Sequence, residues 1–195
     1  MLKRPPVDID CLLMEGTRLG KGESSYPDEL SVQKRIEDIL RNAGTITFLF
    51  SSSQNIDRMV SAYKACIKTG AIFVIDLYTA YVLERLSSVS KNIPQFDWRN
   101  VRVKFYKNHA DILASQVSVK LLYRYNKKKI EMEEISSKKE KILMLTRYNS
   151  IFPRIVKSIP GHQGAKVIYS MWEGFLTEKF KKYCETEGLV IENVH

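Results

Sequence analysis

The sequence predicts an α/β protein with three layers, in which helices flank a mostly parallel central sheet. Short β-rich runs alternate along the chain with stretches of helical periodicity, and this alternation is typical of βαβ units with right-handed crossovers. Several β-rich runs are apolar throughout, as expected for parallel strands that helices cover on both faces. The 195 residues, 44% of them hydrophobic, are enough for one domain with a substantial core.

The strands are predicted from short runs rich in β-branched, aromatic and aliphatic residues. Most of these runs are four to seven residues long, which is the usual length of a strand. The predicted strands are Asp10–Met14, Thr45–Phe50, Ala71–Asp76, Val101–Tyr106, Ile142–Thr146, Ala165–Met171 and Leu189–Val194.

Helices are predicted between these strands from apolar spacing and from terminal signals. Asp28, after Pro27, is a candidate N-cap for the first helix, and Gly44 and Gly70 follow the first two helical stretches as stop signals. Pro153 is expected to start or kink a short helix. The predicted helical stretches are 26–44, 55–70, 77–88, 111–125, 150–159 and 172–188.

Polar residues follow most of the predicted strands. In open parallel sheets, ligands bind beyond the carboxyl ends of the strands, so these residues are expected to line one cleft. The segments assigned to the cleft are Ser51–Asn55, Asp76, Thr146–Asn149 and Ser170–Glu173.

The stretch "FLFSSSQNIDR" carries the strongest binding signal among these strand ends. A strand leads into three serines and an asparagine and then into a helix, whose free N–H groups and neighbouring hydroxyls favour a phosphate. Arg58, one turn into the helix, could add a charge-assisted contact. The alternative is plain N-capping of the helix by Ser53 or Asn55.

Several function classes find no support in the sequence. It contains no Walker lysine motif, no GxGxxG, no HxHxDH and no HExxH, so an NTPase or dinucleotide enzyme is not expected. The histidines, His109, His162 and His195, stand alone, and an isolated histidine is more often a surface or core residue than a ligand. No apolar run approaches the roughly 20 residues that a membrane span needs.

The three cysteines are far apart and show neither a disulfide framework nor zinc spacing. Reduced, buried thiols in a cytoplasmic protein are therefore expected. The formal net charge of +9 favours a polyanionic partner. The segment 125–141 mixes lysines with glutamates, which is typical of a solvated helix or loop, with a nucleic-acid patch as the alternative.

Four blocks occur in the order that is typical of one known family. They are "DIDCLLMEGT", "FLFSSSQNIDRMVSAYKACIKTGAIFVIDLYTAYVLERL", "VIYSMWEGF" and "VIENVH". Together they resemble the β-CASP branch of the metallo-β-lactamase superfamily, which includes ribonuclease J and the endonuclease that cuts pre-mRNA before polyadenylation. The resemblance covers nearly the whole chain.

The resemblance implies roles for particular residues. In the family, an acid at the end of the strand entering the β-CASP insertion orients a histidine beside the metal site, and Glu15 matches this acid. The serine-rich turn would face the RNA backbone, with Ser51, Ser52, Asn55 and Arg58 as candidate phosphate contacts.

Trp172 is a further candidate from the sequence. Its side chain could offer a flat face to a base, although an aromatic residue after a strand more often packs internally.

The resemblance also implies a division of the chain. Residues 1–17 would be a remnant strand of the metallo-β-lactamase fold, 18–188 the β-CASP domain, and 189–195 the start of the return strand. The zinc-binding HxHxDH motif lies upstream of this region in the family, and the second-motif histidine belongs to a segment like "HTSGHA". The chain is therefore expected to hold no stoichiometric zinc and to be inactive alone, with zinc in the full-length parent.

Two functions thus remain open from the sequence. The first is the nucleic-acid-facing half of a zinc-dependent β-CASP hydrolase, an RNA-processing nuclease acting on RNA or single-stranded DNA, whose partner is the missing metallo-β-lactamase half. The second is a free-standing, non-catalytic module that binds nucleic acid or protein. An unrelated α/β carrier of the flavodoxin type would need a phosphate loop and an apolar ring pocket, and neither signal is strong.

Overall fold

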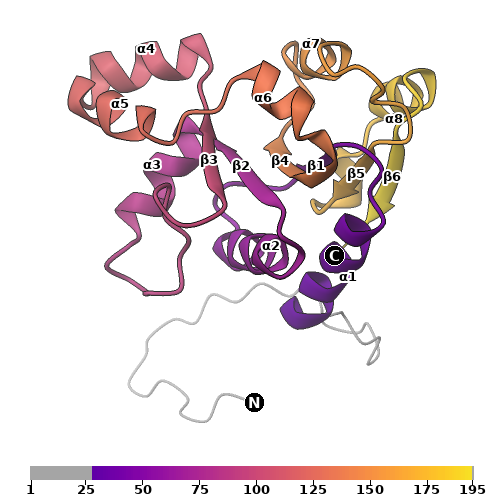
Figure 1. Ribbon diagram of the computed structural model, residues 1–195, viewed down its shortest axis with the longest axis horizontal. Coiled ribbons are helices and arrows are strands. Elements are labelled where there is room, and N and C mark those ends of the chain that lie inside the picture. The colour runs from indigo at the N-terminus through magenta and orange to yellow at the C-terminus, as the bar shows by residue number, and fades with distance from the viewer. Residues whose placement is uncertain (1–27, 195) are drawn as a thin grey trace, which may run out of the picture.

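The computed structural model describes residues 28–194 as a three-layer α/β fold, which confirms the predicted fold class. Within these residues six strands form one sheet in which every neighbouring pair is parallel, in the order β3-β2-β4-β1-β5-β6 (Figure 1). The strands are β1 Thr47–Phe50, β2 Ile72–Asp76, β3 Val101–Lys104, β4 Ile142–Thr146, β5 Lys166–Tyr169 and β6 Val190–Asn193.

Helices cover both faces of the sheet (Figure 1). α1, α2 and α3 pack on one face, and α6, α7 and α8 pack on the other. Two short 3₁₀ turns, η1 Lys139–Lys141 and η2 Glu173–Phe175, complete the described elements. The helices are α1 Glu29–Arg41, α2 Ile56–Thr69, α3 Leu77–Arg85, α4 Lys107–Gln116, α5 Val119–Asn126, α6 Met132–Ser137, α7 Phe152–Lys157 and α8 Glu178–Thr186.

The chain reverses its direction across the sheet after β3. From β1 to β2 to β3 it moves toward one edge, and from β3 onward it returns through β4 and β5 to β6 at the other edge. The helices after β2 and β4 therefore leave toward opposite faces of the sheet. The helix α3 belongs to one apolar core and α7 to the other. Such a reversal opens a crevice above the carboxyl ends of the neighbouring strands.

Each face of the sheet has its own apolar core. On the face of α7 and α8, aromatic rings from strand and helix interlock, with Phe50 stacked on Phe180 at a centroid distance of 4.8 Å and edge-on to Phe152 at 5.1 Å. On the opposite face, α1 and α2 bury Ile36 and Met59 completely. Burial on both faces explains why these strands are apolar throughout in the sequence.

Most of the predicted terminal signals are present, but Gly44 is not the C-cap of α1, which ends at Arg41 with Asn42 as its cap. Asp28 accepts a hydrogen bond of 2.7 Å from the backbone N–H of Ser31. Hydrogen bonding by the Ser31 side chain, and then by this N–H, lowers the pKa of the Asp28 carboxyl. Gly70 ends α2 in the left-handed conformation, with φ of 75°, which only glycine adopts without strain. Pro153 stands in the first turn of α7, where its missing N–H costs nothing.

Two helix predictions were wrong in detail. The stretch 111–125 holds two helices, α4 and α5, because Ser118 begins a new helix by accepting a bond of 3.2 Å from the N–H of Lys120. The stretch 172–188 begins as the 3₁₀ turn η2, and α8 starts only after Thr177, whose hydroxyl caps it. In both places a hydroxyl side chain competes with continuous helix for the backbone N–H groups.

The proposed division of the chain stays a prediction. The predicted strand Asp10–Met14 and Glu15 lie outside the described residues. The end of the chain, assigned to the return strand of a second fold, contains β6, which pairs with β5 in the same sheet. No helix in residues 28–194 is long and apolar enough to span a membrane.

Candidate functional site

A cavity of about 540 Å³ lies above the carboxyl ends of β1, β2, β3 and β4, at the reversal of the chain. This volume falls in the range of small-molecule sites in proteins, roughly 300–1,000 Å³. Apolar side chains from α3, α4 and α7 form much of its wall. Its polar and aromatic lining residues are Ser53, Asp76, Tyr78, Tyr81, Tyr106, His109, Gln116, Thr146, Arg147 and Asn149.

Arg147 is the cationic side chain in the lining of this cavity. It follows β4 directly and donates from Nη2 to the Oγ of Ser53 at 3.1 Å, and its guanidinium lies 5.9 Å from the centroid of the Tyr78 ring. Ser53 is itself held by a 2.8 Å hydrogen bond to the hydroxyl of Thr79. Arg147 is exposed, and none of its described contacts is a carboxylate, so its guanidinium can still pair with an anion.

Asp76 has two roles in the structure. Its Oδ1 accepts a 2.7 Å hydrogen bond from the N–H of Thr79 and so caps α3. Its Oδ2 lies 3.6 Å from Nδ1 of His109, on the first turn of α4. Among the described residues that imidazole nitrogen is buried without a hydrogen-bond partner, so it can bond to a ligand in the cavity.

Tyr106 lines the cavity together with Asp76 and His109. Burial, and then the charge of the nearby Asp76, raises the pKa of the Tyr106 hydroxyl, which therefore stays protonated and able to donate. Its ring meets that of His109 edge-on, at a centroid distance of 5.7 Å. The cavity lining thus combines one arginine with hydrogen-bonding and aromatic groups.

The structure brings together only part of the predicted cleft. Ser53, Asp76, Thr146, Arg147 and Asn149 line one cavity, as expected for strand ends on one edge. The segment 170–173 is not in the lining, because β5 lies beyond β1, on the far side from β2 and β4.

The serine turn and Asn55 are engaged mainly in local structure. Asn55 caps α2 by accepting a 3.1 Å bond from the N–H of Arg58, as the capping alternative expected. Ser52 is exposed and accepts from the N–H of Gln54 at 3.2 Å, whereas Ser51 is buried, with its hydroxyl 3.4 Å from the carbonyl of Ser52. Their proposed phosphate contacts stay predictions.

Arg58 has a full set of internal partners. Its side chain is 7% exposed and forms an ion pair with Glu29 at 3.2 Å. Its Nη1 also donates to the carbonyl of Val194 at 3.0 Å, and the hydroxyl of Ser170 donates to the same carbonyl at 2.6 Å. Arg58 therefore ties α1, α2 and the end of β6 together and lies outside the cavity lining.

Trp172 and the remaining candidates lie elsewhere. The Trp172 side chain is 70% exposed, with its ring edge-on to Phe175 at 5.3 Å, so one aromatic surface is open to solvent. Glu15 and His195 lie outside the described residues. His162 is nearly buried, with Nδ1 3.0 Å from the carbonyl of Ile159 and Nε2 3.4 Å from Glu187, which is a structural environment.

The cavity residues absent from the predicted phosphate contacts share a simple signal. Asp76 is the last residue of a predicted strand, and His109 and Arg147 come within three residues after one, so the rule for parallel strand ends points to each of them. No cluster of three or more metal-ligating side chains occurs within residues 28–194. No protein-family model matches the chain, and no curated protein matches it either.

Proposed function

We propose that this chain is the RNA-facing α/β unit of a β-CASP-type metallo-hydrolase, an RNA-processing nuclease in the cytoplasm. The observation that carries the proposal is the cavity at the carboxyl edge, whose lining includes Arg147 together with Asp76, Tyr106 and His109. An arginine suits a phosphate, and aromatic and hydrogen-bonding groups suit a base and its sugar. The order of the four sequence blocks that resemble the β-CASP branch supports the choice of this enzyme class.

The proposal limits what the described residues do. They bind and orient RNA, and no hydrolytic step is assigned to them, because the metal-binding residues of such an enzyme would lie outside them. In the complete enzyme two zinc ions would supply an activated water for attack on the phosphodiester. The buried cysteines within residues 28–194, Cys66 and Cys184, are both free thiols, which suits a reducing compartment.

The test of RNA binding is the affinity of the 195-residue chain for a labelled five-nucleotide RNA, measured by fluorescence anisotropy. Arg147→Ala should weaken binding about tenfold, the loss of one charge-assisted contact of roughly 1.4 kcal/mol. Arg154→Ala is the matched control, because Arg154 is exposed on α7 and is not in the cavity lining. Equal affinities of the two variants would remove the cavity from the binding site.

The enzyme class has a separate test in the flanking coding sequence. An in-frame HxHxDH motif upstream and an SGHA segment downstream would support the β-CASP hydrolase. A stop codon and a start codon with no such neighbours would favour a free-standing binding module instead.

A further inference from the structure

We infer that a second RNA-backbone contact runs along the β3 edge of the sheet. We call the surface of residues 99–107 and 120–129 the edge strip. This inference rests on the proposed function and extends it from a single cavity to a longer path for the nucleic acid.

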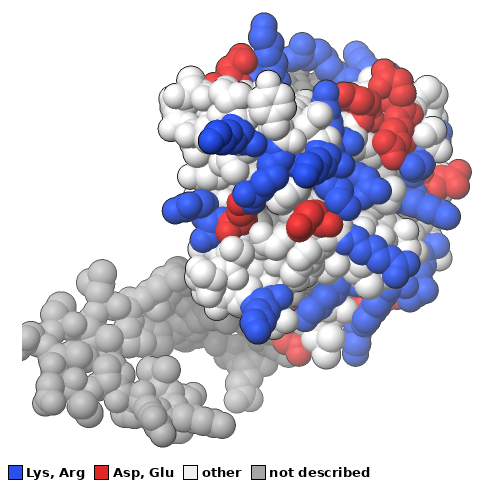
Figure 2. Space-filling view, turned by 60° about the vertical axis from the view of Figure 1, so that its left-hand side comes forward, with Lys and Arg blue, Asp and Glu red and all other residues white. Residues whose placement is uncertain are grey.

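The edge strip holds most of the excess charge of the protein. Its two segments contain nine lysines and arginines and no acidic residue, against a formal net charge of +9 for the whole chain. Figure 2, in which the side carrying α4, α5 and β3 is turned toward the viewer, shows Lys and Arg side chains gathered across the middle of that face, with a few acidic groups among them and an acidic cluster at its upper right. Such a concentration of one sign attracts a polyanion.

The fold brings the two segments together. β3 is an edge strand, and on its open side Val103 forms a parallel bridge with Lys129. The N–H of Val103 donates to the carbonyl of Lys128 at 2.8 Å, and the N–H of Ile130 donates back to Val103 at 3.0 Å. The lysines after α5 are thereby held next to the basic residues of β3 and its flanks.

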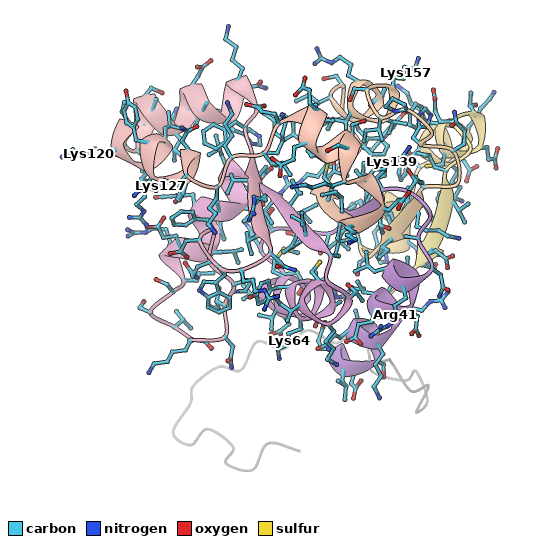
Figure 3. All side chains as sticks on the ribbon, viewed as in Figure 1. Arg41, Lys64, Lys120, Lys127, Lys139 and Lys157 are labelled. Carbon is cyan, nitrogen blue, oxygen red and sulfur yellow. The ribbon has the colours of Figure 1, made fainter. Side chains whose placement is uncertain are left out.

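Three cations of α5 and its C-cap lie on one face of the helix. Lys120, Arg124 and Lys127 are spaced i, i+4 and i+7, which places them on a common stripe. Lys120 and Lys127 are both exposed, and Figure 3 shows them on the same side of the molecule, away from Lys64 and Arg41.

The acidic neighbours neutralise only part of the strip. Glu131 pairs with Lys104 at 3.2 Å and with Lys129 at 2.6 Å, and Glu84 of α3 pairs with Arg124. Four further cations of the strip take part in no ion pair within residues 28–194, so they can pair with phosphates. They are Arg99, Arg102, Lys120 and Lys127.

The strip begins at the rim of the cavity. Lys107, exposed at the start of α4, lies between Tyr106 and His109 in the sequence, and both of these line the cavity. A single strand with one nucleotide in the cavity can therefore continue along β3 and α5 with its phosphates over the cations. RNA recognised through its backbone in this way is bound with little regard to sequence.

The test compares a twenty-nucleotide RNA with the five-nucleotide RNA on the whole chain. The double variant Lys120→Ala, Lys127→Ala should bind the long RNA about tenfold more weakly and lower the slope of log affinity against log salt by up to about 1.4, since each phosphate contact contributes about 0.7. The same variant should bind the short RNA as the unchanged protein does.

The control is the double variant Arg41→Ala, Lys64→Ala, which removes the same charge from α1 and α2 on the other side (Figure 3). Equal effects of the two double variants on the long RNA would overturn the edge strip and leave the cavity proposal standing. Failure of the unchanged chain to bind the short RNA would instead overturn the proposed function. Strip-dependent binding of polyglutamate with no strip-dependent binding of RNA would overturn the inference in favour of an acidic protein.

Discussion

Two arginines near strand ends differ completely in their surroundings. Arg58 is buried in α2, paired with Glu29 and bonded to a carbonyl at the end of β6. Arg147 stands at the end of β4, exposed, with a serine hydroxyl and a tyrosine ring as its contacts. The difference teaches that position after a strand does not define a binding arginine, because a guanidinium already satisfied by a carboxylate has less to offer a phosphate.

The largest expected effect separates the two arginines by stability. Arg58→Ala should lower the free energy of unfolding by about 2–4 kcal/mol, because it leaves the buried carbonyl of Val194 with one donor fewer and removes the partner of Glu29. Arg147→Ala should change it by less than about 0.5 kcal/mol, since the side chain is exposed. Urea unfolding of both variants measures the comparison.

The same pair of variants tests the earlier hypothesis that Arg58 contacts a phosphate. Arg58→Lys keeps the charge and loses the forked geometry, so it serves as the control for charge alone. An Arg58→Ala protein of unchanged stability but weakened, less salt-dependent RNA binding would reverse the roles assigned to the two arginines.

A pH titration of stability tests a thiol of the buried core. Burial raises the pKa of the Cys184 thiol from its usual 9.0 to about 12. Above pH 9 the unfolded chain loses this proton while the folded protein keeps it, so stability is complete below pH 9 and falls as the pH rises toward 12, by up to about 1.4 kcal/mol per pH unit.

Cys184→Ala should therefore make the loss of stability between pH 9 and 12 shallower, measured by unfolding at a series of pH values. Thr186→Ala, which changes a residue of the same helix but removes no ionisable group, should keep the steeper dependence of stability on pH. An identical pH dependence for Cys184→Ala and the unchanged protein would rule out the thiol as its source.

The smallest expected effect concerns Asp76, which belongs to both the helix cap and the cavity. Asp76→Ala removes the cap of α3 and should cost about 1 kcal/mol of stability. Asp76→Ser keeps a capping oxygen and should lie close to the unchanged protein, although it too lacks the carboxylate beside His109. A loss of stability as large in the serine variant would point to the contact with His109 as the stabilising one.

Most of the fold could be predicted from the sequence because its signals are local. Apolar runs marked the described strands to within a few residues, and Asp28 and Gly70 marked helix ends through capping chemistry that depends on a few neighbouring residues. The break between α4 and α5 was missed because Ser118 can either continue a helix or cap a new one, and packing decides between them.

The site could be predicted only in part because it depends on strand order. The carboxyl-end rule placed Asp76 and Thr146–Asn149 in a cleft, and the structure has Asp76 and Arg147 in one cavity with Ser53. The contact between Arg147 and Ser53 requires β4 to lie beside β1, and the periodicity of the sequence does not reveal this strand order. The edge strip was hidden for the same reason, since four of its nine cations lie on β3 and its flanks and five lie in α5 or directly after it.

The central position of β1 has a consequence for how the protein is made. Thr47 pairs with Leu143 on one side and with Lys166 on the other, so both neighbours of β1 come from the last third of the chain. During synthesis β1 must wait, with its backbone groups unpaired, until β4 has left the ribosome, whereas β2 and β3 can pair much earlier. Contacts so distant along the chain slow folding and expose strand edges to other chains. The early apolar strand "TFLF" is therefore a segment that a nascent chain leaves open to aggregation and to chaperones.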